Sequence, residues 1–194
     1  MQIEYEATFI NIDKDEIRGR LQKAGAKLVY PEMVQKRLVF SPAVGFQKYG
    51  KFLRVRDEGD KITLTLKQVG SGGIEDKKEI EVDVSDFDKT ISILEAIGCI
   101  PRSYEGSKRE LWELDGAKIT IDDWPFLYSL VEVECVSEQE VKNMSERLGF
   151  DWNEAKFCTA GDLYREKYGK GPLDIFNEKG SMTTLVFDGV NPFL

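Results

Sequence analysis

The sequence contains no histidine in its 194 residues. This absence excludes nucleophilic sites of the Ser-His and Cys-His types, and it excludes metal sites built on imidazole. Only three cysteines occur, and the spacing of Cys99, Cys135 and Cys158 favours neither a disulfide framework nor a zinc site. Any catalysis must therefore depend on carboxylates, lysine, arginine, hydroxyl groups and a hard metal ion.

Long apolar runs and an excess of positive charge are also missing. No apolar stretch approaches the ~20 residues that cross a membrane, and Met1 leads directly into a strand pattern without the features of a signal peptide. The net charge of −8 argues against a general nucleic-acid-binding surface. We therefore expect a soluble cytoplasmic protein that forms one domain over residues 1–194, without a membrane or nucleic-acid partner.

Three segments share one plan, which is a strand with two alternate acidic residues, then a capped helix, then a glycine. The strands read IEYEATF, KEIEVDV and SLVEVECV. The helices are expected over residues 13–25, 85–98 and 137–149, with Asp13, Ser85 and Ser137 as N-caps. Each ends at a glycine in the position where a C-cap is wanted.

Further alternating segments predict more strands, namely QKRLVF, FLRVR, ITLTLK, SKRELWEL and KITID. Loops are expected at residues 41–51 and 68–76, and a Gly/Pro-containing connection at residues 169–182. A last strand is expected in TTLVFDG. Many strands with about three helices predict an α+β fold with a largely antiparallel sheet.

Strand alternation sorts the apolar residues to one face of this sheet and the charged residues to the other. An ordinary sheet with one solvated face would show the same alternation. Here, however, the charge signs also segregate by strand, with acidic pairs on three strands and Arg54, Arg56 and Lys67 on a hairpin. If the sheet closes into a barrel, the charged face lines the lumen. A triphosphate with Mg²⁺ or Mn²⁺ would then neutralise both sets of charges.

Several of these segments, taken in order, resemble the CYTH superfamily, also called triphosphate tunnel metalloenzymes. They are the strand with Glu4 and Glu6, LRVR with Lys67, KEIEVDV, SKRELW and IDDWPFLYSLVEVE. The similarity spans residues 1–168, which leaves residues 169–194 as a C-terminal extension. The resemblance implies an eight-stranded antiparallel β-barrel, or tunnel, with a charged lumen and helices packed outside. Relatives in the superfamily are class IV adenylyl cyclases, thiamine triphosphatases and inorganic triphosphatases.

The resemblance also implies roles for individual residues. Catalytic roles fall to Arg54, Arg56, Lys67, Arg109, Glu79 and Glu81. The cations expected to bind substrate are Arg37, Arg54, Arg56, Lys67, Arg109 and Lys118. The carboxylates expected to bind Mg²⁺ or Mn²⁺ are Glu4, Glu6, Asp122, Glu132 and Glu134. The expected partner is ATP, thiamine triphosphate or tripolyphosphate, and homodimer formation is a further expectation from the family.

Thr8 is the plainest departure from the family pattern, because it stands where the E-x-E-x-K signature has lysine. We hypothesise that Arg37 partly restores the missing charge, with Lys156 as the second candidate. Three functions stay open: hydrolysis of a triphosphate, cyclisation of ATP to cAMP and pyrophosphate, and binding of a nucleotide or polyphosphate without turnover. The loss of lysine at Thr8 motivates the third.

Three aromatic residues follow the expected metal-binding strand, at Trp124, Phe126 and Tyr128. They could stack on a nucleobase or on thiamine. Packing in the core or at the rim of the barrel is the alternative, and it is the more common role of buried aromatic side chains.

Overall fold

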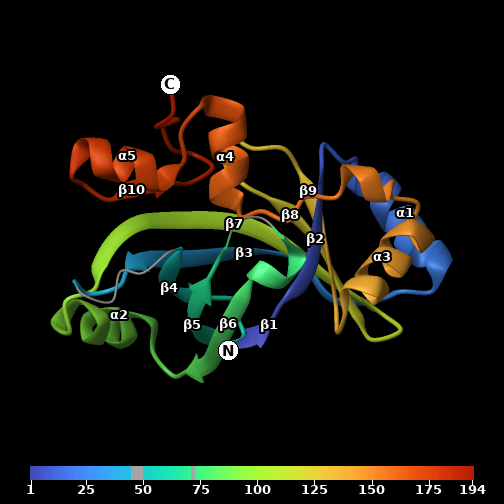
Figure 1. Cartoon of the computed structure of the whole chain (residues 1–194), viewed down its shortest axis with the longest axis horizontal. Helices are drawn as coiled ribbons and strands as arrows, with labels where there is room; N and C mark the ends of the chain where they lie inside the picture. Colours follow the sequence, from blue (N-terminus) through green and yellow to red (C-terminus); the bar gives the residue numbers. More distant parts are fainter. Residues whose placement is uncertain (45–49, 71–72) are drawn as a thin grey trace.

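The computed structural model describes residues 1–44, 50–70 and 73–194, and it consists of a strongly curved sheet with helices around it (Figure 1). The strands are β1 (Gln2–Ile3), β2 (Tyr5–Ile10), β3 (Lys27–Ser41), β4 (Lys51–Asp57), β5 (Ile62–Gln68), β6 (Lys78–Val84), β7 (Ile100–Leu114), β8 (Ala117–Asp123), β9 (Leu130–Cys135) and β10 (Thr183–Leu185). The helices are α1 (Lys14–Ala24), α2 (Phe87–Ala96), α3 (Glu138–Arg147), α4 (Ala160–Tyr168) and α5 (Pro172–Lys179). Short 3₁₀ helices span Ile74–Asp76 and Trp152–Glu154.

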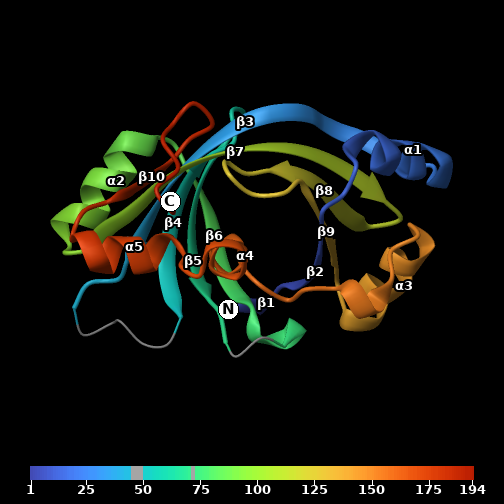
Figure 2. The ribbon, with the colours of Figure 1, turned by 90° about the horizontal axis from the view of Figure 1, so that it is seen from above.

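The strands pair in the order β1-β6-β5-β4-β3-β7-β8-β9-β2, and neighbours on this path are antiparallel. β1 and β2 are consecutive pieces of one N-terminal segment, separated only by Glu4. They form the two ends of the path, since β1 pairs with β6 and β2 pairs with β9. The sheet therefore curls into a nearly closed barrel, whose curvature is visible in Figure 2. This confirms the predicted α+β fold with an antiparallel barrel. The described path has nine strands instead of eight because the N-terminal strand breaks at Glu4.

The N-terminal segment forms the seam of the barrel. Between β1 and β2, the backbone N–H of Glu4 donates to the carbonyl oxygen of Lys77 at 3.0 Å. The edge of β2 that does not face β9 is also paired, because Thr8 and Lys156 exchange two backbone hydrogen bonds of 2.9 Å each. The backbone of the acidic strand is therefore fixed from both sides.

The helix caps follow the sequence with one correction. The Asp13 side chain accepts hydrogen bonds from the first turn of α1, and Ser137 does the same for α3. The cap of α2 is Asp86 and not Ser85, because the Asp86 carboxylate reaches the N–H of Lys89 at 2.8 Å. Among the described residues, no helix is long and apolar enough to cross a membrane.

The expected connection at residues 169–182 is wrong, because α5 lies within it. Pro172 occupies the first turn, the Asp174 carboxylate accepts the Gly171 N–H at 2.8 Å, and Gly180 ends the helix with a φ of 65°. Proline at the start and glycine just past the end are typical helix boundaries. The last strand is confirmed as β10, which pairs in parallel with β7.

Two strands are longer than predicted, since β3 begins at Lys27 and β7 at Ile100. Their first halves, KLVYPEMV and IPRSYEG, lack strict alternation. Because the two strands are antiparallel, each first half pairs with the second half of the other strand, with register shifts along the pairing. The loops expected at residues 41–51 and 68–76 fall partly on residues 45–49 and 71–72, which lie outside the described part of the chain.

Helices cover the apolar outer face of the barrel only in part. α1 and α3 pack on one side through a cluster that includes Leu21, Ile119, Val133 and Val141, while α2 covers Phe40 and Val55. The outer face of β6 is not covered in the described structure, where Ile80 and Val82 are 49% and 51% exposed. Helices pack outside the barrel as expected, but they leave this strand uncovered, because tertiary packing and not alternation sets which strands receive a helix.

Two glycine substitutions test how α5 is held. A Cβ at Gly171 would lie 2.8 Å from the carbonyl oxygen of Gly161 at the start of α4, whereas a Cβ at Gly19 in α1 meets nothing within 4 Å. We expect Gly171→Ala to lower the free energy of unfolding by about 1–3 kcal/mol through overpacking. Gly19→Ala should raise it by about 0.5–1 kcal/mol, because alanine is the better helix former. Urea unfolding of both variants measures this, and equal effects would contradict the close approach of α4 and α5.

Candidate active site

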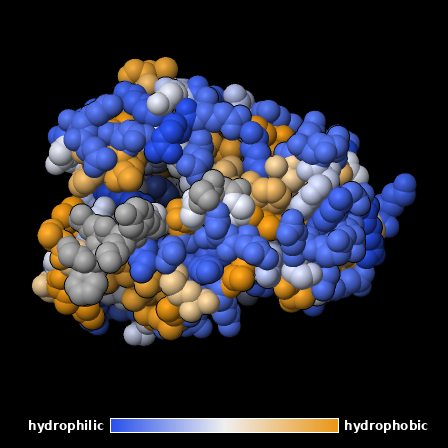
Figure 3. All heavy atoms as spheres, in the orientation of Figure 1, coloured by the Kyte–Doolittle hydropathy of each residue, from blue (hydrophilic) through white to orange (hydrophobic). Residues whose placement is uncertain are grey.

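The barrel encloses a cavity of about 770 Å³. Its walls come mainly from the inner faces of the strands and from one side of α4 and α5. Figure 3 shows a hollow with hydrophilic residues inside, on the face of the molecule below α5. This volume lies in the range of pockets that enclose drug-sized ligands.

Almost all the site residues expected from the sequence line this cavity. They are Glu4, Glu6, Arg37, Arg54, Arg56, Lys67, Glu79, Glu81, Arg109, Lys118, Glu132 and Glu134. The exception is Asp122, which is fully buried behind Arg109 and is not part of the lining. Alternation explains the result, because residues two apart on a strand point to the same face of the sheet.

The cationic wall is built by β3 and β4. Arg37 lies directly across from Arg56 in the strand register, and Arg54 lies across from Thr65 of β5. The three arginine residues are only 3–9% exposed. Burial and the neighbouring arginines lower the pKa of Arg37 to about 9, and the same causes lower the pKa of Arg56 to about 10. This wall therefore carries more positive charge than its protein surroundings balance.

The guanidinium groups of this wall have protein partners at their terminal nitrogen atoms. Arg56 lies 2.6 Å from Glu58, and Arg54 lies 3.4 Å from Glu81. Arg37 donates to Gln35 at 3.2 Å and to Ser107, and it lies over the Trp124 ring at 4.3 Å. Within the described residues, the Nε atoms of Arg37, Arg54 and Arg56 are buried and have no hydrogen-bond partner. Buried donors without a partner are rare because they cost free energy. An anion with several oxygen atoms would satisfy them.

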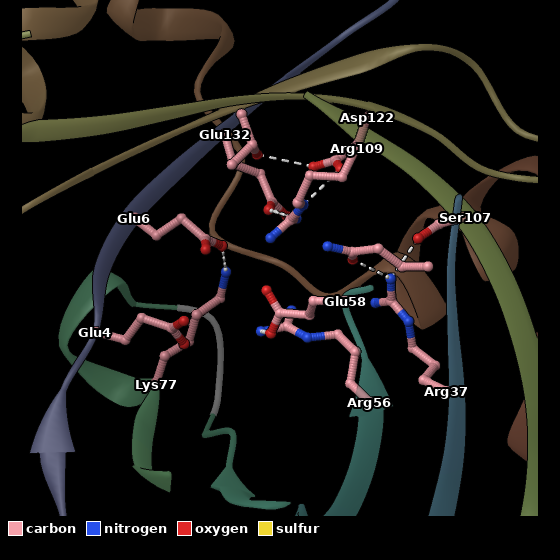
Figure 4. Close-up of polar contacts among 12 residues, drawn as sticks. Glu4, Glu6, Arg37, Arg56, Glu58, Lys77, Ser107, Arg109, Asp122 and Glu132 are labelled. Carbon is pink, nitrogen blue, oxygen red and sulfur yellow. Dashed lines mark hydrogen bonds and ion pairs between the residues drawn. The ribbon is translucent and has the colours of Figure 1, made fainter. Parts of the chain in front are cut away.

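The acidic residues on the opposite side are held by separate cations (Figure 4). Lys77 Nζ lies 2.7 Å from Glu6, and Arg109 contacts Asp122 at 2.6 Å and Glu132 at 2.6 Å. Further along, Lys67 Nζ lies 2.8 Å from Glu4 and 3.2 Å from Glu79, and Lys118 lies 3.2 Å from Glu134.

Glu6 and Glu132 have opposite pKa shifts although they lie in the same acidic group. Burial alone would raise the pKa of Glu6, but Lys77 and Lys67 lower it to about 2. Burial raises the pKa of Glu132 to about 7, and the charge of Glu6 adds to this effect, which Arg109 only partly offsets. Negative charge is therefore in excess around Glu132.

Lys77 is a cavity residue that the sequence reasoning missed. It precedes β6, is 8% exposed and forms its ion pair with Glu6 inside the barrel. Burial would lower the pKa of Lys77, but Glu6 and Glu132 raise it instead. The sequence does contain a pattern that points to Lys77, because it stands two residues before Glu79 in the same alternation as Glu79 and Glu81.

Thr8 lies inside the barrel wall, opposite Glu132 in the register of β2 and β9. It is 1% exposed, and its hydroxyl oxygen has no hydrogen-bond partner among the described residues. Lys156, the second candidate for the missing charge, directs its ammonium group to Glu166 at 2.9 Å and is not part of the cavity lining. Arg37 does line the cavity, so its compensating role stays a prediction.

The aromatic residues at positions 124–128 have different surroundings. Trp124 is buried and lines the cavity beneath Arg37, whereas Tyr128 is 41% exposed and lies under Lys167 at 4.2 Å. Phe126 packs at the edge of the cluster around Leu163 and Tyr164. Phe126 therefore packs against a core cluster, Tyr128 is exposed beside Lys167, and neither residue lines the cavity.

The expected metal ligands fit Mg²⁺ or Mn²⁺ by their chemistry, because both ions prefer carboxylate oxygens. In the described structure, however, no three Asp, Glu, Cys or His side chains converge as a metal site. Arg109 and Lys77 instead hold the carboxylates of Asp122, Glu132 and Glu6. Metal binding would therefore require some of these ion pairs to open.

Comparison with known proteins decides the family. Residues 2–155 match the model of the CYTH domain. The chain belongs to the CYTH domain family. No curated protein gives a significant match to the CYTH chain.

Solved structures share the fold of this CYTH chain at low sequence identity. A conserved hypothetical protein from Pyrococcus furiosus has a TM-score of 0.69 and 20% identity, covering 82% of this chain and 99% of its own. A Vibrio parahaemolyticus protein described as a "putative adenylate cyclase" has a TM-score of 0.72 and 12% identity. The match covers 84% of this chain and 97% of the Vibrio chain. HpAC1 from Hippeastrum, described as a "putative adenylyl cyclase" with a dominant triphosphatase activity, has a TM-score of 0.57 and 14% identity. The match covers 86% of this chain and 96% of the HpAC1 chain.

Glu132→Gln tests the excess of negative charge. The raised pKa of Glu132 means that the folded protein binds this proton more tightly than the unfolded chain, so stability falls as pH rises from the ordinary value of 4.5 to about 7. We expect the variant to be more stable than the wild type by on the order of 2–3 kcal/mol at about pH 8, with little difference below about pH 4.5.

Thermal and urea unfolding across this pH range measure the effect. Glu134→Gln on the same strand is the matched control, because Glu134 is more exposed and pairs with Lys118 near the surface. A variant that is less stable than the wild type at about pH 8 would show that Arg109 outweighs the neighbouring carboxylates.

Proposed function

We propose that this CYTH protein is a metal-dependent triphosphatase whose substrate lies in the barrel cavity. The observation that carries the proposal is the buried wall of Arg37, Arg54 and Arg56, with three Nε donors that lack partners in the described structure. Arginine forks match the geometry of phosphate oxygens, and several phosphates in a row would engage several arginines.

The proposed division of the cavity follows its charges. Arg54, Arg56 and Lys67 hold the phosphate chain, with Arg37 and Lys118 as further contacts. Glu79 and Glu81 lie beside these cations, since Glu81 is 3.4 Å from Arg54 and Glu79 is 3.2 Å from Lys67. In this position they can accept hydrogen bonds from an attacking water and orient it. Phosphoryl transfer depends on such positioning and on charge neutralisation more than on a strong base.

The carboxylates proposed to hold Mg²⁺ or Mn²⁺ are Glu4, Glu6, Asp122, Glu132 and Glu134. When bound, the ion would neutralise phosphate oxygens and polarise the phosphorus centre. Arg109 keeps Asp122 and Glu132 together through hydrogen bonds of 2.6–2.7 Å. We therefore assign Arg109 a positioning role for the acidic group as well as the predicted contact with substrate.

Adenylyl cyclisation is the second candidate, and the description of the Vibrio protein as a "putative adenylate cyclase" motivates it. In that reaction the ribose 3′-hydroxyl attacks the α-phosphorus of ATP, and pyrophosphate leaves. The description of HpAC1, with its dominant triphosphatase activity, supports ranking hydrolysis first. Binding without turnover is the third candidate, and Lys77 weakens its motivation because it supplies a buried cation in the acidic group. Homodimer formation stays a prediction.

The activities are separated by their products. We expect purified protein with Mg²⁺ or Mn²⁺ to release orthophosphate from at least one of ATP, thiamine triphosphate and tripolyphosphate. Cyclic AMP with pyrophosphate would identify the cyclase, and binding by calorimetry without any product would identify the binding protein. Arg54→Ala is the matched negative variant, because it removes one of the buried guanidinium groups of the phosphate-binding wall.

A second experiment asks whether Lys77 supplies the charge that Thr8 lacks. A charged hydrogen bond contributes about 1.5–3 kcal/mol, so Lys77→Met should lower kcat/KM by about ten- to a hundredfold. Thr8→Lys should leave the wild-type rate unchanged, yet raise the rate of Lys77→Met, because both positions adjoin the pair Glu6 and Glu132.

Lys156→Met is the matched control, since this lysine pairs with Glu166 outside the cavity lining. Loss of Lys77 leaves the buried Glu6 without its partner, so urea unfolding must show whether Lys77→Met stays folded. The double variant Lys77→Met with Glu6→Gln removes both charges and so avoids the unpaired carboxylate. A large rate increase from Thr8→Lys in the wild-type background would contradict compensation by Lys77.

A further inference from the structure

Apolar side chains gather at one end of the described cavity, next to the arginine wall, where Lys67 lies across from Phe52 in the strand register. On β4, Phe52 precedes Arg54 and Arg56 in the same inward-facing row, and all three line the cavity. Ile100 at the start of β7 joins it from the neighbouring part of the wall, together with Leu173 and Phe176 of α5. A group attached to the end of a bound phosphate chain would therefore meet an apolar surface.

The contribution of α5 is fixed by the spacing of its residues. Leu173, Phe176 and Asn177 stand at positions i, i+3 and i+4, so they share one face of the helix, and all three line the cavity. The other face carries Ile175, which is buried in a cluster with Tyr164 and Leu185. The apolar face toward the cavity is therefore separate from the face that anchors the helix.

α5 is also held firmly against α4. Arg165 of α4 contacts Asp174 at 3.0 Å, and Asp174 in turn accepts the N–H of Gly171 at 2.8 Å. The backbones of Gly161 and Gly171 approach so closely that a Cβ at Gly171 would be 2.8 Å from the Gly161 carbonyl. Figures 1 and 2 both place α4 and α5 on the same side of the barrel. Leu173 and Phe176 are thus set in place before any ligand arrives.

This helix lies outside the residues that define the family. The CYTH match ends at residue 155, whereas α5 begins at Pro172. The apolar end is therefore built in part by residues that lie beyond the matched CYTH domain.

A cation borders the apolar end. The Arg102 guanidinium lies 5.0 Å from the centre of the Phe52 ring, and both residues line the cavity. Burial lowers the pKa of Arg102, with only Glu105 acting in the opposite direction. A second positive charge at this end would be repelled, whereas a neutral planar ring could stack there. A purine is neutral, while the thiazolium ring of thiamine is cationic.

We propose that the apolar end, formed by Phe52, Ile100, Leu173 and Phe176 and bordered by Arg102, binds the base of a nucleoside triphosphate whose phosphates extend along the arginine wall. The inference rests on the proposed triphosphatase function and names its substrate class. Nucleoside triphosphates are then preferred over thiamine triphosphate and over tripolyphosphate, and α5 is the element that sets the preference.

Phe176→Ala is the decisive variant, with ATP and tripolyphosphate as the two probes in the presence of Mg²⁺. Stacking of one base on one aromatic ring predicts that the ratio of kcat/KM for ATP to kcat/KM for tripolyphosphate falls about ten- to a hundredfold, mainly through KM. Lys179→Ala is the matched control, because it lies in the last turn of the same helix, is exposed and does not line the cavity. An unchanged ratio, or an equal loss for both substrates, would overturn the inference.

The outcome separates this inference from the proposed function. Turnover of tripolyphosphate with an unchanged ratio in Phe176→Ala overturns the base site alone. Absence of turnover with every triphosphate overturns the hydrolase, and calorimetric affinities for Mg²⁺ with ATP or with tripolyphosphate then test the base site by the same ratio. Arg102→Gln completes the test, because it should raise the affinity for thiamine triphosphate relative to ATP, and an unchanged relative affinity would remove the charge argument.

Discussion

The burial of like charges in one lumen is the constraint on which the rest of this structure depends. Arg37, Arg54 and Arg56 are nearly inaccessible on adjacent strands, and the pKa of Arg37 falls to about 9 because burial and its neighbours oppose its charge. Such an arrangement destabilises the folded state unless an anion accompanies it. The apolar packing of α1, α2 and α3 on the outside of the barrel must offset this cost in the free protein. The charged lumen lowers the stability of the folded protein, and the apolar packing outside the barrel raises it. Such a trade between stability and a charged site is common in proteins.

The acidic group shows the same principle with the opposite sign. Arg109 and Lys77 prevent the carboxylates of Asp122, Glu132 and Glu6 from facing one another unpaired. They do so incompletely, since the pKa of Glu132 still rises to about 7. A metal ion bound here would take over part of the role of these two cations. Ligand binding and the internal ion pairs would thus compete for the same oxygen atoms, which links metal affinity to the freedom of Arg109 and Lys77 to move.

The lumen could be predicted from the sequence because it depends on a local rule. Alternation alone assigns Glu4, Glu6, Arg54 and Arg56 to one face, and closure of the sheet turns that face inward. The features that escaped prediction depend on tertiary contacts or on weak local signals. The exposure of Ile80 follows from which strands receive a helix. The sequence of α5 does not reveal a helix because Pro172 and Gly180, which usually interrupt helices, are its boundaries. Lys77 was missed because it precedes the strand whose alternation it continues.

The seam of the barrel explains how a cation can change its place in the sequence without leaving the acidic group. The backbone of Glu4 is hydrogen-bonded to the carbonyl of Lys77, so the start of β6 and the N-terminal strand are fixed relative to each other. Positions 8 and 77 therefore both lie beside the acidic group. In this structure Lys77 supplies the cation that pairs with Glu6, whereas Thr8, opposite Glu132, is uncharged. The chemistry of the lumen constrains where charge lies in space, and closure of the sheet leaves more than one strand able to supply it. In this chain the strand that carries Glu4 and Glu6 therefore does not by itself show which cations surround the acidic group.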